Sequence, residues 1–127
     1  MTILFTAHSL LRWLILFVAF TAVIKFALGW ARGSSFKGMD RGLMAGFSGL
    51  MDLQATLGLI LLLWDGFANV GFPGYRISHA VIMTFAAIVP HLSIRWKKAD
   101  DKTRFRNNLF VIIGSLVLIF FGLRAVA

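Results

Sequence analysis

The chain has 127 residues, of which 59% are hydrophobic and only 14% are charged. A soluble domain of this size cannot bury so much apolar surface, so the composition predicts that a lipid bilayer surrounds most of the chain. Because there is no cysteine, disulfides, thiolate metal sites and covalently attached c-type haem are excluded.

The first predicted element is a long apolar helix over residues 4–28. It begins without a basic segment and is far longer than the core of a signal peptide, which favours a retained membrane span. His8 and Arg12 lie on it one helical turn apart. From the rise of an α-helix, His8 lies about 6 Å below the start of the span, and Arg12 lies ~6 Å deeper. Such groups are rare in hydrocarbon unless they have a partner or a function.

The second predicted span, residues 43–64, carries Asp52 and Gln54 near its middle. Two roles are open for them. One is a structural bridge between Arg12 and Asp52 that Gln54 joins, since a charge in lipid needs a partner. The other is a polar lining for a quinone headgroup or a proton path. The span also has a thin face of small residues, which we expect to pack inside the bundle rather than to form a dimer motif. Its members are Gly42, Gly46, Gly49 and Gly58.

The third predicted span, residues 77–95, is the most interrupted. His79 opens it, within about one turn of the surface that His8 also lies near. Pro90 should free the carbonyl near Ala86 and kink the helix. His91 follows, roughly 18 Å below His79 and at the depth of Asp52, with which it can pair. We expect His91 to be a hydrogen-bonded interior histidine, with proton transfer or quinone contact as the alternative.

The fourth predicted span covers residues 108–123. With four spans assigned, most lysines and arginines fall in connectors on one side of the membrane. Nine lysines and arginines lie in the first and third connectors, against two on the opposite side. The positive-inside rule then places those connectors in the cytoplasm and both termini outside, as in a bacterial inner (plasma) membrane protein. The net charge of +8 therefore needs no nucleic-acid partner. The nine are Arg32, Lys37, Arg41, Arg95, Lys97, Lys98, Lys102, Arg104 and Arg106, and the two are Arg76 and Arg124.

Short connectors predict an all-α, polytopic membrane protein: a single up-down-up-down four-helix transmembrane bundle over residues 1–127. The first and third spans are then diagonal, and His8 and His79 lie in the same outer layer. Two imidazoles facing each other across that diagonal could ligate the iron of one b-type haem. Arg12 or Arg76 could pair with a haem propionate. The plainer interpretation is an interfacial histidine bonded to a backbone carbonyl or a lipid headgroup.

Several stretches also resemble a known family. "HSLLRWLIL", "MDR", "DLQATLGLILLLW", the histidine that opens the third span and "KKADDKTRFRN" are similar to short four-span bacterial membrane proteins often labelled cytochrome b-like. The resemblance covers nearly the whole chain. In that family an acidic residue often precedes the third-span histidine and a proline follows it, whereas here the neighbours are Ser78 and Ala80. The most specific matches are His8, Ser9, Arg12, Trp13, Asp52, Leu53, Gln54 and His79.

These observations lead to one functional prediction and two alternatives. The prediction is a small b-type cytochrome-like electron-transfer subunit with one bis-histidine haem b near the outer, periplasmic side, which exchanges electrons with quinol or a larger redox complex. The first alternative is a non-catalytic accessory or assembly subunit of a respiratory or photosynthetic membrane complex. The second is a small transporter or channel, for which a homo-oligomer would have to supply the pore. No motif points to hydrolysis, and whether the chain is an enzyme stays open.

Overall fold

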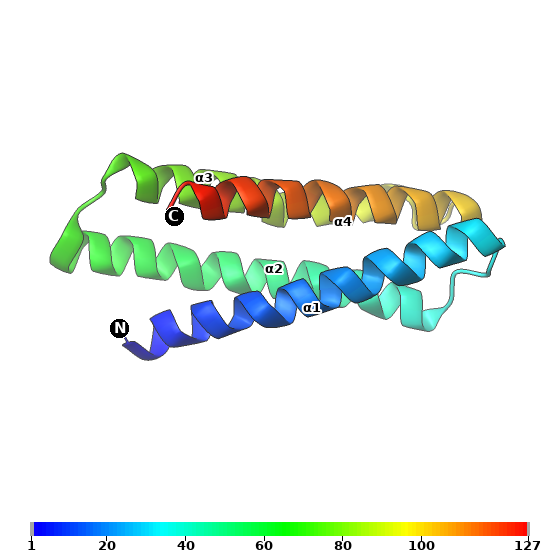
Figure 1. Ribbon diagram of the computed structural model, residues 1–127, viewed down its shortest axis with the longest axis horizontal. Helices are drawn as coiled ribbons and strands as arrows, with labels where there is room; N and C mark the ends of the chain where they lie inside the picture. Colours follow the sequence, from blue (N-terminus) through cyan, green and yellow to red (C-terminus); the bar gives the residue numbers. More distant parts are fainter. Residues whose placement is uncertain (1, 127) are drawn as a thin grey trace.

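The computed structural model describes residues 2–126 as four antiparallel helical rods (Figure 1). They are long and apolar enough to cross a membrane. The predicted all-α four-helix bundle is therefore confirmed. The first rod is α1, Thr2–Arg32; the second is α2, Gly38–Asp65, extended by a π-helical turn η1, Gly66–Val70; the third is α3, Gly74–Ile88, extended by a 3-10 segment η2, Val89–Trp96; and the fourth is α4, Asp101–Arg124.

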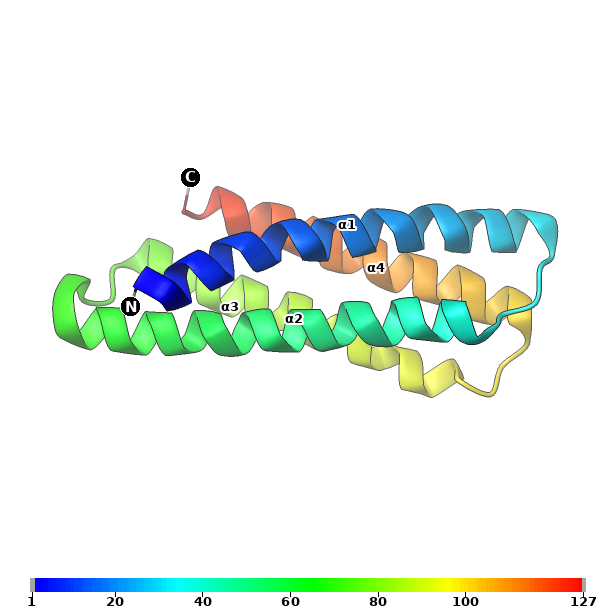
Figure 2. The ribbon, with the colours of Figure 1, turned by 90° about the horizontal axis from the view of Figure 1, so that it is seen from below.

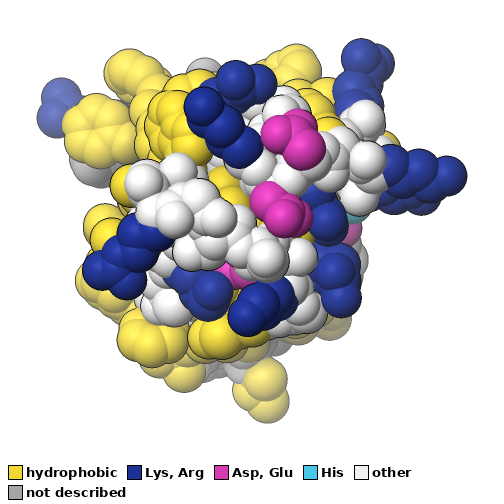
Figure 3. Space-filling model, turned by 90° about the vertical axis from the view of Figure 1, so that its right-hand side faces the viewer, with side chains coloured by type: hydrophobic (Ala, Val, Ile, Leu, Met, Phe, Trp, Pro, Cys, Tyr) yellow, Lys and Arg dark blue, Asp and Glu magenta, His cyan; other side chains and the backbone are white. Residues whose placement is uncertain are grey.

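The four rods form a ring in which α1 packs against α2 and α4, and α3 packs against the same two helices. The first and third rods are therefore diagonal, as the short connectors predict. Both termini lie at the same end of the bundle as η1, and the first and third connectors lie at the opposite end (Figures 1 and 2). Lysine and arginine side chains crowd that opposite end (Figure 3).

The tight core lies in the half of the bundle nearest the basic connectors. Phe26, Phe36 and Phe105 pack there with ring centroids 5.0–6.1 Å apart. Along α1 the buried residues begin only at Ile15. The first turns of α1 therefore contribute no buried residue among those described, and this half of the bundle is less filled. Large apolar side chains such as Phe17, which is 70% exposed, cover the outer surface. The chain is accordingly a multi-pass membrane protein in contact with lipid.

The start of α2 is held by a carboxylate that the sequence does not single out. Asp40 is only 1% exposed, and its Oδ1 lies 2.7 Å from Lys25 Nζ. Its other oxygen accepts a hydrogen bond from the Lys37 backbone N–H at 2.9 Å. The carboxylate thus satisfies an N-terminal amide of α2 and ties that end of the helix to α1.

The third rod changes from α-helix to 3-10 helix at Pro90, the second residue of η2. Proline has no N–H to donate to the carbonyl of Ala86, one turn earlier. Ser115 of α4 supplies the missing donor, with its Oγ 3.1 Å from the Ala86 oxygen. The freed carbonyl that the sequence predicts is thus satisfied from a neighbouring helix, as backbone groups in a membrane must be.

Candidate functional site

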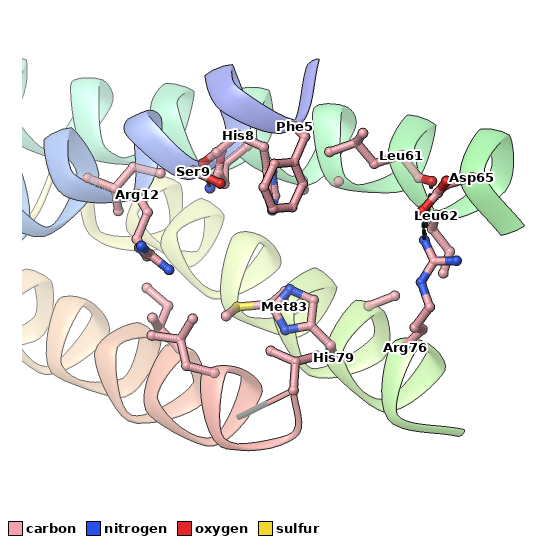
Figure 4. Close-up of a pocket in the computed structure, with 18 of the residues that line it drawn as sticks. Phe5, His8, Ser9, Arg12, Leu61, Leu62, Asp65, Arg76, His79 and Met83 are labelled. Carbon is pink, nitrogen blue, oxygen red and sulfur yellow. Dashed lines mark hydrogen bonds and ion pairs between the residues drawn. The ribbon is translucent and has the colours of Figure 1, made fainter. Parts of the chain in front are cut away.

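A cavity of about 650 Å³ lies between the helices in the half of the bundle that holds the termini. This volume is within the range of small-molecule sites, about 300–1,000 Å³. All four helices line it, because the first turns of α1 do not fill the interior there. Figure 4 shows its polar side chains facing one another across the opening. Its lining includes His8 and Arg12 of α1, Gln54 and Gly58 of α2, and His79 and Met83 of α3.

His8 enters the cavity from α1 with its ring against a glycine of α2. A Cβ at Gly58 would lie 3.1 Å from the His8 Cε1 atom, so the glycine makes room for the imidazole. The amide of Gln54 donates to the backbone oxygen of His8 at 2.7 Å and fixes α1 against α2 at this level. The His8 Nδ1 atom is buried and has no hydrogen-bond partner among residues 2–126.

His79 enters the same cavity from the diagonal helix α3 (Figure 4). Its Nδ1 lies 2.8 Å from the backbone oxygen of Gly122 in α4. A carbonyl can only accept, so Nδ1 is the ring nitrogen that donates, and in the neutral form of the ring the lone pair is then on Nε2. Histidines that ligate metals use this arrangement, in which the second ring nitrogen donates to a carbonyl and so fixes the tautomer.

Arg12 points into the cavity one turn deeper than His8 (Figure 4). Its guanidinium carbon lies 5.0 Å from the centre of the Trp13 ring. Its Nε atom and the Oε1 atom of Gln54 are buried without a hydrogen-bond partner within residues 2–126. With the His8 Nδ1 atom, three unsatisfied polar atoms therefore line one cavity. Buried polar groups are normally paired, so this cluster indicates a site for a ligand with polar groups or for ordered water.

Arg76 lies at the end of the cavity nearest η1, and its guanidinium forms hydrogen bonds with the protein backbone. Its guanidinium donates to the backbone oxygens of Gly71 at 3.0 Å and Leu61 at 3.3 Å. The carboxylate of Asp65 lies 4.0 Å away. Arg76 therefore ties the α2–α3 connection together, and Arg12 is the arginine better placed to receive an anionic group in the cavity.

The predicted bridge between Arg12 and Asp52 does not form. Asp52 instead accepts from His91 Nε2 at 2.9 Å, on the outside of the bundle. These two side chains are 49% and 57% exposed, so His91 is not an interior histidine. The predicted network divides because Gln54 faces inward and Asp52 outward. Side chains two positions apart on an α-helix point in directions that differ by roughly 200°, so these two lie on opposite sides of α2.

The prediction that the small-residue face of α2 packs inside the bundle is also wrong for most of its length. A Cβ at Gly42, Gly46 or Gly49 would meet no atom of residues 2–126 within 4 Å. Only Gly58 packs against an interior side chain. Gly58 lies nine residues beyond Gly49, about half a turn around the helix, so the four glycines do not share one face.

Comparison of the chain with known protein families, with curated proteins and with solved structures finds no match. The resemblance to cytochrome b-like proteins stays a prediction. Among residues 2–126 there is no group of three or more His, Cys, Asp or Glu side chains that could hold a bare metal ion.

Proposed function

We propose that the chain is a small b-type cytochrome-like subunit that binds one haem b in the cavity, with His8 and His79 as axial ligands. The observation that carries the proposal is that both imidazoles line a single cavity from diagonal helices. A macrocycle held between diagonal helices can contact the side chains of all four, which is how cofactors are held in helix bundles.

The residues present fit such a group. The tautomer of His79 leaves Nε2 able to coordinate, through its bond to Gly122. His8 is partly buried and has a buried Nδ1 without a hydrogen-bond partner, and the cavity walls include apolar side chains such as Met83. The guanidinium of Arg12 suits a propionate carboxylate, which would satisfy its unpaired Nε. When bound, haem supplies one-electron transfer. The chain's own contribution is to fix the imidazoles, exclude water and place a positive charge nearby, which favours the more reduced state of the site.

The proposal includes an orientation and a partner. The crowded basic end of the bundle would face the cytoplasm, following the positive-inside rule, and the cavity would lie toward the periplasmic side of a bacterial inner membrane. The electron donor or acceptor would then be quinol within the bilayer or a larger membrane redox complex.

The test is the optical spectrum of the purified protein after expression in haem-replete cells. The proposal predicts a reduced-minus-oxidised spectrum of the b type and one haem per chain, both lost in His8→Ala and in His79→Ala. A haem-free protein that is folded and stable would contradict it. That outcome would instead favour the accessory or assembly role.

A further inference from the structure

A second recess lies between α1 and α4 at the basic end of the bundle. Its volume is about 170 Å³. That is room for a group several times larger than a water molecule, whose share of the liquid is about 30 Å³. It has no lining residue in common with the cavity that His8 and His79 line. The recess is lined by Lys25, Leu28, Gly29, Arg32, Ser34 and Phe105.

The local structure of α1 brings these residues together. The four that belong to the helix follow the spacing i, i+3, i+4, i+7, which keeps side chains on one side. The chain then turns at Gly33, whose φ of +64° is the left-handed conformation common at helix ends. The turn brings Ser34 back to the end of α1, where its backbone N–H donates to the Gly29 oxygen at 3.0 Å. The Gly29 carbonyl is therefore satisfied and does not oppose an anion as a free acceptor.

The polar side chains of the recess can act as hydrogen-bond donors. The Lys25 ammonium has three N–H groups, and Asp40 Oδ1 accepts at 2.7 Å, while the side chain stays 36% exposed. Arg32 is exposed and unpaired, because the ion pairs within residues 2–126 are those of Lys25, Arg76 and His91. An ammonium, a guanidinium and a hydroxyl that line one space suit the oxygens of a phosphate, which accept hydrogen bonds.

The surroundings of the recess identify an anionic phospholipid as the source of that phosphate. Lysine and arginine side chains crowd this end of the bundle (Figure 3). Within residues 2–126 the only carboxylate within 4.0 Å of any of them is Asp40, beside Lys25. Basic pockets between membrane helices bind anionic lipid headgroups. Leu28 and Ile24 are exposed one turn apart on α1 and offer an acyl chain an apolar surface that leads from the recess toward the middle of the helix.

We propose that the recess binds the phosphate of one anionic phospholipid, with Lys25, Arg32 and Ser34 as donors and an acyl chain along the exposed side of α1. Lipid headgroups are expected at this level, because Arg32 is the last residue of a membrane-spanning helix. The proposal is independent of the haem, since the two sites share no residue. Changes in the recess should therefore leave the haem content unaltered.

Native mass spectrometry of the purified protein with equal amounts of phosphatidylglycerol and phosphatidylethanolamine tests the proposal. We expect one phosphatidylglycerol to be retained in preference to the zwitterionic lipid. Arg32→Gln should weaken its retention about fivefold, the effect of one basic side chain near an anionic surface. Lys98→Gln is the charge-matched control, since Lys98 is exposed at the same end but does not line the recess. Equal retention of the two lipids, or equal losses in the two variants, would overturn the proposal.

Two adjacent serines distinguish binding in the recess from general attraction to the basic end. Ser34 lines the recess, whereas Ser35 is exposed and does not. Ser34→Asp places a carboxylate among the donors, so it should lower phosphatidylglycerol retention severalfold more than Ser35→Asp, which changes the net charge equally. Circular dichroism verifies that the helices persist in both variants. Similar losses for the two serines would contradict a site in the recess, and displacement of the lipid by inorganic phosphate would overturn its assignment to a phospholipid.

Discussion

The roles of individual cavity residues depend on which side chains or backbone groups of the neighbouring helices they contact. Gly58 matters because a side chain there would meet the His8 ring. Gly122 accepts from His79 Nδ1 through its backbone carbonyl, and a Cβ there would lie 2.8 Å from the Met83 Cε atom. The sequence identifies both histidines and Arg12, since ionisable groups in apolar segments are conspicuous. It does not identify the two glycines, because glycine is common in membrane helices and only the packing shows which ones a ligand site needs.

Replacing Gly58 by leucine should displace His8 and lower haem occupancy severalfold. The side chain would occupy the space of the imidazole, whose Cε1 atom would lie 3.1 Å even from an alanine Cβ. Gly114→Leu is the control, because a Cβ there has no neighbour within 4 Å in the described part of the chain. Both changes remove a helix glycine and gain similar intrinsic helix propensity, about 1 kcal/mol. The measurement is the ratio of haem to protein after purification, and equal ratios for the two variants would refute the role of Gly58.

At the scale of the elements, the helices were predictable from apolar length, but the register of their side chains was not. Hydropathy marks only the apolar part of each span, so α1 begins and ends beyond residues 4–28, and η1 adds a turn after α2. The kink at Pro90 follows from the chemistry of proline, whereas Ser115 as its compensating donor could not be inferred. That contact depends on how α3 and α4 align, which no local pattern determines.

The hydrogen bond from Ser115 to the Ala86 carbonyl should stabilise the contact of α3 with α4. Ser115 is fully buried, so Ser115→Ala leaves that carbonyl without its donor. We expect a loss of about 0.6–1.7 kcal/mol in the free energy of unfolding, from the average to the largest value found for such bonds in membranes. Thermal or denaturant unfolding in detergent measures it. Ser48→Ala, at a serine that is not fully buried, is the control, and an equal loss there would contradict the assignment.

The buried carboxylate of Asp40 should contribute more than the exposed acidic residues do. Asp40→Asn weakens its contact with Lys25 and leaves that ammonium group with a poorer partner. We expect a loss of about 1.5–3 kcal/mol, as for hydrogen bonds to charged groups. Asp101→Asn in the exposed first turn of α4 is the comparison and should cost much less. Unfolding in detergent distinguishes them, and similar losses for both would show that burial of Asp40 is unimportant.

In the whole molecule, the cluster of lysine and arginine side chains and the cavity lie at opposite ends of the bundle. The basic connectors gather at one end (Figures 1 and 3). The cavity opens in the half with the termini. The sequence predicts this polarity well, because charge placement and span order are both readable along the chain. It could not predict that one half would be tightly packed and the other hollow. That difference shows in α1, whose buried residues begin only at Ile15.

The proposed orientation predicts opposite labelling of the two ends of the bundle. In intact spheroplasts, Phe67→Cys in η1 should react with a membrane-impermeant thiol reagent, and Ser34→Cys in the first connector should not. Permeabilised cells should label both, since both positions are exposed. The reverse pattern would invert the topology and place the cavity on the cytoplasmic side.

The central claim is that His8 and His79 ligate one haem iron together, and electron paramagnetic resonance of the oxidised protein tests it most directly. Two imidazole ligands give a six-coordinate low-spin iron. We predict that signal in the wild-type protein and in His91→Ala, whose histidine lies outside the cavity. We predict its loss or conversion to a high-spin signal in His8→Ala and in His79→Ala. A low-spin signal that persists in either of these two variants would contradict the account.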